Sequence, residues 1–441
     1  MKSLYLIPTL GLLVHLHANE ALEILEGRKD AADAVVTVVP DDAALIQGGT
    51  ASADGKVTKP FIPSEPSAFS KKSHEILDPI WSKTTIIKEE ENPYIQELTM
   101  IGLFEATGAW GQVETTTATA TAPTATQRNL DDIAMRRAQL GARMKAFYRT
   151  EVTGVVEMAG NSRMNGIQTL KARTEIYENT GITIGKFRPL STQENGMPDG
   201  ELLTNERSLM SNMIAPADSL GVMFDAKNKD WSYNLGWFSG DYSNMIPNVK
   251  DNGLINAGMA YETTGKTETG VPLRSRWYLN LLHNLDKDGS EVLPRHPHGF
   301  SAYYDDIIST GFSVQQDRFG LQGDFTLARG DKNAWGFTLT PSYWIMPNTI
   351  QLVGRYHYAD TDQINALSGG YGTSTDPFFS GNESVINGDE YHSFYFGANV
   401  HLYENRMIIS NGIEYSIFKD ELDTGDETKS LLWQSGARLS F

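Results

Sequence analysis

Charged residues of opposite sign gather in neighbouring regions of this chain. Basic residues recur at even spacing in two short segments, and because successive side chains of a β-strand point to opposite faces, each set would lie on one face of its strand. The region 189–218 is acidic instead. Opposite charges that face each other across a narrow space create a field that orients dipolar molecules. The basic set is Arg137, Arg143, Lys145, Lys171 and Arg173, and the region 189–218 carries Glu194, Asp199, Glu201, Glu206 and Asp218 against Arg207, with Arg188 just before it.

A second interpretation of the basic set is open. Glu151, Glu157 and Glu175 fall on the same strand face by the same spacing. Ion pairs with these glutamates would only keep that face hydrated, since exposed pairs contribute little to stability. The spacing alone does not decide between the two interpretations.

The remaining polar residues form no motif for catalysis or metal binding. Of nine histidines, His357 and His401 are expected on the polar face of their strands, but neither belongs to a nucleophile motif. Residues 286–289 imitate the start of a calcium loop without its later ligands, and His296 and His298 lack partners. We therefore expect no catalytic residue, metal or cofactor, and we predict that the protein is not an enzyme.

The strands that would position these side chains are clearest at the C-terminus. In the stretch 431–441, Leu431, Trp433, Leu439 and Phe441 alternate with polar residues. A tilted strand needs about 9–11 residues to cross a bilayer, and outer-membrane barrels place apolar side chains outward and polar ones inward. We expect Phe441 to end the strand that closes such a barrel.

The rest of the chain repeats this alternation, which predicts an all-β fold: a transmembrane antiparallel β-barrel of about sixteen strands. A soluble sandwich also alternates, but it has no reason to keep short and long connections apart. Here the connections 146–148, 178–180, 227–230, 346–349 and 403–406 are short, and the intervening ones are mostly long. The exceptions are 263–274, a long turn on the short side, and the doubtful strand 298–310. The predicted strands are 94–113, 133–145, 149–160, 168–177, 181–188, 219–226, 231–239, 254–262, 275–284, 298–310, 319–329, 335–345, 350–359, 391–402, 407–418 and 431–441.

Composition and the N-terminus indicate the compartment. The apolar stretch after Lys2 predicts a signal peptide over 1–18, followed by a flexible periplasmic segment over 19–93 and a barrel domain over 94–441. No later apolar run is long enough for a membrane helix. The absence of cysteine excludes disulfides, and a net charge of −18 argues against nucleic acid as a partner. The Thr/Ala tract Thr115–Thr126 is predicted to be a solvated outer loop.

An ordered set of short motifs runs through residues 131–240. It comprises Arg136-Arg-Ala-Gln-Leu-Gly141, Gly185-Lys-Phe-Arg-Pro189, Asn205-Glu-Arg-Ser-Leu209, Ala215-Pro216 and Leu220-Gly221-Val222. This set resembles the phosphate-selective porin O and P family, and a weaker likeness continues at 323–325 and 352–358. The resemblance implies homotrimeric, sixteen-stranded outer-membrane channels for small anions, in which an inward-folded third outer loop, here 189–218, sets the constriction. Members commonly carry an arginine pair where this chain has Ala217-Asp218-Ser219.

These observations predict a porin in the outer membrane of a Gram-negative-type bacterium. Because the third outer loop is acidic and lacks that arginine pair, we expect passive diffusion of small polar solutes and inorganic ions. The expected partners are these solutes, outer-membrane lipid and two further copies of the chain. The alternatives are a phosphate- or anion-selective porin, a structural or adhesive envelope barrel, and an outer-membrane enzyme.

Overall fold

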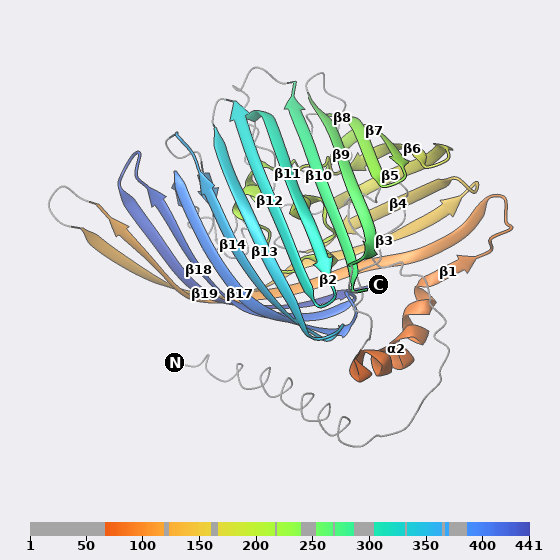
Figure 1. Ribbon diagram of the computed structural model, residues 1–441, viewed down its shortest axis with the longest axis horizontal. Coiled ribbons are helices and arrows are strands. Elements are labelled where there is room, and N and C mark those ends of the chain that lie inside the picture. The colour runs from red at the N-terminus through yellow and green to blue at the C-terminus, as the bar shows by residue number, and fades with distance from the viewer. Residues whose placement is uncertain are drawn as a thin grey trace.

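The computed structural model describes residues 67–118, 123–159, 166–216, 218–239, 253–267, 270–285, 304–330, 333–363, 367–369 and 386–441. Within these ranges one large antiparallel sheet of seventeen strands contains a closed ring of sixteen, and β1 (Thr85–Lys88) is attached to it (Figure 1). The predicted antiparallel β-barrel and its strand number are confirmed. The ring consists of β2 (Ile95–Thr117), β3 (Thr124–Ala146), β4 (Thr150–Glu157), β5 (Gly166–Tyr177), β6 (Thr180–Phe187), β7 (Ser219–Asn228), β8 (Trp231–Ser239), β9 (Gly253–Lys266), β10 (Pro272–Asn284), β11 (Tyr304–Gln316), β12 (Phe319–Gly330), β13 (Ala334–Met346), β14 (Ile350–Asp360), β17 (Glu390–Tyr403), β18 (Met407–Asp420) and β19 (Asp426–Ser440).

The ring closes where the last strand pairs with the first. Strands β19 and β2 pair from Ser440 opposite Leu103 to Glu427 opposite Thr116. Phe441 extends this ladder, because its N–H donates to the Gly102 carbonyl at 3.0 Å and its carbonyl accepts from the Gly102 N–H at 2.9 Å. A Cβ at position 102 would lie 2.4 Å from the Phe441 ring, so glycine leaves room for the aromatic side chain.

The two faces of the sheet differ in polarity. In β18, Ile413 and Tyr415 are 46% and 37% exposed, whereas Glu414 between them is buried inside the ring. The same alternation makes the outer surface broadly apolar, and an apolar surface of this extent is unfavourable in water. Its exposed members include Leu170, Ile184, Val222, Leu235, Trp277, Leu281, Phe325, Leu339, Phe394, Phe396, Leu431 and Trp433.

The connections at one end of the barrel are all short, and those at the other end are mostly longer, with 331–333 between β12 and β13 as the exception. The short turns span 147–149, 178–179, 229–230, 267–271, 317–318, 347–349 and 404–406. All but one of them hold a non-glycine residue with φ between 46° and 62°, such as Asn179 and Asn348, and the turn 267–271 holds Gly270 with φ 81°. Left-handed residues match the twist of tight hairpins. The predicted segregation of connection lengths is therefore confirmed.

Several predicted strand boundaries were wrong. The apparent long turn 263–274 is short, because β9 runs on to Lys266 and β10 starts at Pro272. The doubtful strand 298–310 is β11, which begins at Tyr304 and ends at Gln316. The two ends of the Thr/Ala tract lie in strands, since β2 extends to Thr117 and β3 starts at Thr124, where β-branched threonines pair across the two strands.

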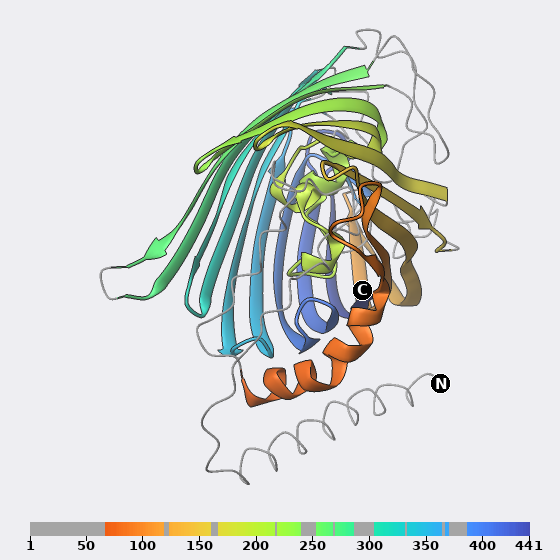
Figure 2. The ribbon, with the colours of Figure 1, turned by 90° about the vertical axis from the view of Figure 1, so that its right-hand side faces the viewer.

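The described part of the predicted flexible segment 19–93 is structured, which corrects that prediction from residue 67 onward. It forms α2 (Ala68–Trp81), η2 (Ser82–Thr84) and β1, and α2 lies at the short-turn end of the barrel (Figure 2). The Trp81 indole N–H donates to the Ser440 carbonyl at 2.8 Å, and the rings of Trp81 and Tyr403 are 4.9 Å apart. No helix in the described ranges is long and apolar enough to cross a membrane. The predicted signal peptide, 1–18, lies outside the described residues.

Replacing Phe441 with Asp should lower the yield of folded barrel, because a carboxylate at this seam replaces the ring that packs beside Gly102 and Phe104. The measurement is the fraction of heat-modifiable protein in isolated membranes. Leu422→Asp, in an exposed turn at the barrel end that carries the longer connections, is the control and should fold normally. Equal yields for the two variants would contradict the importance of this seam.

Candidate functional site

Residues 188–218, which we call the interior loop, connect β6 to β7 and lie within the ring of strands, as Figure 2 shows for the yellow-green segment. The loop contains α3 (Gln193–Gly196), η3 (Asp199–Glu201) and α4 (Leu209–Ile214). The hydroxyls of Thr192 and Ser208 cap α3 and α4 by accepting backbone N–H groups. Every residue of α4 is buried.

Apolar contacts hold α4 against the inner wall. Leu209, Met210, Met213 and Ile214 belong to one buried cluster with side chains from strands on several sides of the ring. Removing this area from water stabilises the loop by about 25 cal/mol per Å². The wall contributes Phe187, Met223, Phe238, Leu254, Leu282, Tyr304, Ile307, Ala328, Ala334, Ala359, Tyr391 and Phe418, and Leu367 of β15 (Leu367–Gly369), which pairs with β16 (Ile386–Gly388), completes the cluster.

Amide side chains of the wall bind the backbone of the interior loop. Asn256 donates to the Leu190 carbonyl at 2.8 Å, Asn280 to the Ser191 carbonyl at 2.6 Å, and Asn399 to the Leu203 carbonyl at 2.9 Å. These bonds satisfy loop carbonyls that the surrounding protein shields from water.

Carboxylate and imidazole groups of the wall accept hydrogen bonds from backbone N–H groups of the loop. The Gln193 N–H donates to Asp324 Oδ2 at 2.8 Å, and the Leu209 N–H donates to His357 Nδ1 at 3.2 Å. His357 thus serves as an acceptor for the loop. His401, the other histidine predicted to face inward, lies 2.9 Å from the Glu404 carbonyl in the adjacent turn.

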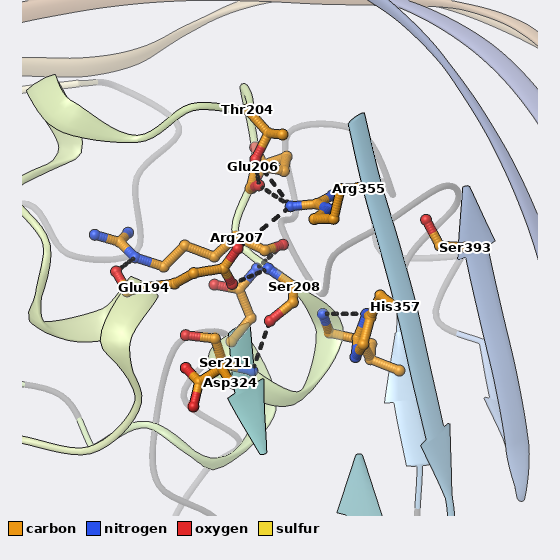
Figure 3. A network of polar contacts seen from close by, with 12 residues as sticks. Glu194, Thr204, Glu206, Arg207, Ser208, Ser211, Asp324, Arg355, His357 and Ser393 are labelled. Atoms are coloured by element: carbon orange, nitrogen blue, oxygen red, sulfur yellow. Dashed lines mark hydrogen bonds and ion pairs between the residues drawn. The ribbon is translucent and has the colours of Figure 1, made fainter. Parts of the chain in front are cut away.

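Three wall arginines form the charged anchors of the loop. Arg355 donates to Thr204 Oγ1 at 2.9 Å and to the Glu206 carbonyl at 2.6 Å (Figure 3). Arg136 pairs with the Glu206 carboxylate at 2.6 Å and also donates to the Asn205 carbonyl. Arg438 donates to the carbonyls of Gly200 and Leu202 at 3.3 and 3.2 Å.

Two buried glutamates hold these arginines from the wall side. Glu105 lies 3.2 Å from Arg438 and 3.6 Å from Arg136, and Glu414 lies 3.5 Å from Arg355. Glu414 also accepts hydrogen bonds from Ser393 and Gln434. Removing one partner from such a buried pair commonly costs about 3–5 kcal/mol.

A β-bulge explains why the sequence analysis missed Arg136. The register between β2 and β3 shifts between Glu105 and Ala106, so Arg136 and Arg137 both point inward, although simple alternation assigns them to opposite faces. The inward positions of Arg355 and Arg438 agree with alternation along β14 and β19. Alternation counted from His357 and from Gln434 would have predicted that Arg355 and Arg438 point inward.

The five predicted basic residues lie on the inner face of β3 and β5, but most are already paired. Arg143 and Lys145 both contact Glu97 at 3.1 Å, Arg137 lies 3.6 Å from Glu105, and Arg173 lies 2.6 Å from Asp225. Glu151 lies close enough to interact electrostatically with Lys171 and Arg173, and Glu175 with Arg173, so both interpretations of the basic set stay predictions. Lys171 forms no ion pair within the described residues.

The acidic residues of the interior loop are mostly neutralised as well. Glu206 pairs with Arg136, Asp218 lies 3.1 Å from Arg188, and Glu194 lies 3.7 Å from Arg355 while accepting the Ser208 N–H. Arg207 donates to the carbonyls of Glu194 and Met197 within the loop. Glu201 lines the cavity described next. The Asp199 side chain lies outside the described residues.

A polar cavity of about 260 Å³ separates part of the interior loop from the wall formed by β7 to β12. The inner face of β10 contributes Arg274 and Arg276 to it. Arg274 pairs with Glu262 at 2.5 Å, whereas Arg276 has no hydrogen bond or ion pair within the described part of the chain and lies 5.8 Å from the Tyr278 ring centroid. Neither arginine was predicted. The other polar lining includes Asn234, Asn280, Gln315 and Gln322.

The described residues contain no group of three or more His, Asp or Glu side chains placed to hold a metal ion. The calcium-like stretch 286–289 and the pair His296 and His298 lie outside the described residues.

No family model and no curated protein match the chain. Similar solved structures are outer-membrane porins and channels. An anion-selective porin from Comamonas acidovorans aligns with TM-score 0.48 and 12% identity over 78% of this chain and 99% of that one. The outer-membrane channel DcaP of Acinetobacter baumannii aligns with TM-score 0.45 and 11% identity over 81% of this chain and 100% of that one. OmpT of Vibrio cholerae, in a trimer form, aligns with TM-score 0.45 and 10% identity over 78% of this chain and 99% of that one. Because these TM-scores are below 0.5, the function has to be argued from the chain itself.

Arg355→Gln should loosen the interior loop, because it removes the charged anchor of Thr204 and Glu206 and leaves Glu414 without its arginine. We expect a loss of about 3–5 kcal/mol in the free energy of unfolding, measured by denaturant titration in detergent, and noisier single-channel currents. Arg149→Gln, at an exposed turn, is the control and should change stability by less than about 0.5 kcal/mol. Wild-type stability and quiet currents in Arg355→Gln would contradict the anchoring.

Proposed function

We propose that this chain is a porin, a passive diffusion channel for small polar solutes and ions in the outer membrane of a Gram-negative-type bacterium. The observation that carries the proposal is a closed barrel, apolar outside and polar inside, with a loop fixed across its interior. An apolar outer surface suits lipid, and a polar interior narrowed by a loop suits selective passage of hydrated solutes.

The barrel end with the short turns faces the periplasm in this proposal. Outer-membrane barrels have short periplasmic turns and longer outer loops. The exposed aromatic residues Tyr148, Tyr177, Trp231 and Phe319 gather near the short turns, where an interfacial belt would lie. The helix α2 is then periplasmic, in keeping with export by a signal peptide over 1–18.

We propose a general porin as the first candidate and a phosphate- or anion-selective porin as the second. Arg276 favours the second candidate, because it faces the cavity without a carboxylate partner while the nearby acids Glu262 and Asp225 are held by Arg274 and Arg173. A fixed charge of one sign beside the narrow part of a pore raises the local concentration of the opposite ion.

A homotrimer is proposed from the resemblance to phosphate-selective porins in the sequence. Purified protein in planar bilayers should therefore conduct ions and close in three equal steps. Native mass measurement in mild detergent should give three copies. Monomers alone would contradict the trimer, and the absence of conductance would favour a structural or adhesive barrel.

Arg276→Gln should shift the ion selectivity toward cations. One charge at contact distance contributes about 1 kcal/mol in water, which corresponds to about a fivefold change in the permeability ratio of chloride to potassium. The reversal potential under a salt gradient measures this ratio. Arg149→Gln is the matched control and should leave it unchanged, and an unaltered ratio in Arg276→Gln would place this arginine away from the conducting path.

A further inference from the structure

The membrane-facing surface of the barrel carries an apolar groove of about 460 Å³ across β9 to β12. Its floor is one row of directly paired residues, Ala257, Leu281, Ile308 and Leu327. Leu281 and Ile308 are 42% and 41% exposed. The small side chain of Ala257 leaves a depression at one end of the row, where the other strands carry larger residues.

A polar row borders the groove on the side of the long connections. His283, Asp306 and Arg329 are directly paired across β10, β11 and β12. Nδ1 of His283 lies 2.9 Å from Oδ1 of Asp306, so this carboxylate already has a partner. Arg329 is exposed and has no hydrogen bond or ion pair within the described residues.

The position of Arg329 suits the boundary between hydrocarbon and headgroups. Arg329 is next to Gly330, the last residue of β12, and His283 is next to Asn284, the last residue of β10. An arginine on the lipid face costs about 2–4 kcal/mol at the bilayer midplane but about 0–1 kcal/mol near the interface. At the interface its guanidinium can meet an anionic headgroup, while the apolar row extends toward the membrane interior.

We propose that this groove binds one phosphate-bearing glycolipid of the outer leaflet, with an acyl chain on the Ala257 row and a phosphate at Arg329. The inference rests on the proposed function, since it requires a barrel in the outer membrane with its long connections outside. A guanidinium binds phosphate with paired charge-assisted hydrogen bonds. Packing against a second copy of the same apolar surface would instead bury the Arg329 charge in an apolar contact.

The test is native mass spectrometry of the full chain in detergent, titrated with diphosphorylated lipid A. Arg329→Gln should weaken binding about tenfold, as expected for the loss of a charge-assisted hydrogen bond. Arg318→Gln removes the same charge at the opposite end of the β11–β12 hairpin and is the matched control. Ala257→Trp fills the depression and should also weaken binding while Arg329 remains.

Equal affinity for wild type and Arg329→Gln would overturn the phosphate contact, and equal affinity in Ala257→Trp would overturn the acyl-chain contact. Equal competition by phosphatidylglycerol would overturn the assignment to a glycolipid. Conductance is measured on the same preparations. Conducting protein that does not retain lipid A contradicts only this inference, whereas protein that does not conduct contradicts the proposed channel.

Discussion

The closed hydrogen-bond ladder is the constraint on which the rest of this structure depends. A sheet surrounded by lipid has no water to satisfy a free edge, so every strand must pair on both sides. The pairing of β19 with β2, extended by Phe441 and Gly102, removes the edge and creates an interior at the same time. Period-two alternation then places apolar side chains toward lipid and polar side chains toward that interior.

A polar interior allows the interior loop to be held by charge. Arg136, Arg355 and Arg438 approach it from different strands, and their guanidinium groups donate hydrogen bonds to loop carbonyls. Glu105 and Glu414 keep these buried cations paired from behind. Of the charges that the sequence suggested for a transverse field, Glu206 and Glu194 take part in this attachment. Arg143, Lys145 and Arg173 pair with carboxylates of the wall instead. Arg276 and Lys171 face the interior without an ion pair in the described ranges.

Much of the fold could be predicted from the sequence because alternation and connection length are local signals. Strand limits were wrong where that signal was weak, as in the Thr/Ala tract and around 298–310. The bulge at Arg136 could not be seen, because a register shift depends on the neighbouring strand. The loop contacts depend on residues far apart in the chain, such as Arg438 with Gly200, so the sequence indicated charged faces but not the pairs they form. The order in 67–93 was missed for the same reason, since α2 contacts Ser440 and Tyr403.

The contacts of Arg438 also bear on the order of assembly. This side chain lies in β19, which is synthesised after the other strands of the ring, yet it reaches both Glu105 of β2 and the backbone of Gly200 and Leu202. Contacts at such sequence separation form late, because the intervening chain must first be arranged. The closing of the seam and the final fixing of the interior loop therefore belong to one event. A newly forming barrel would keep a movable loop until its last strand is in place. The narrow passage would therefore reach its final shape only when the barrel closes.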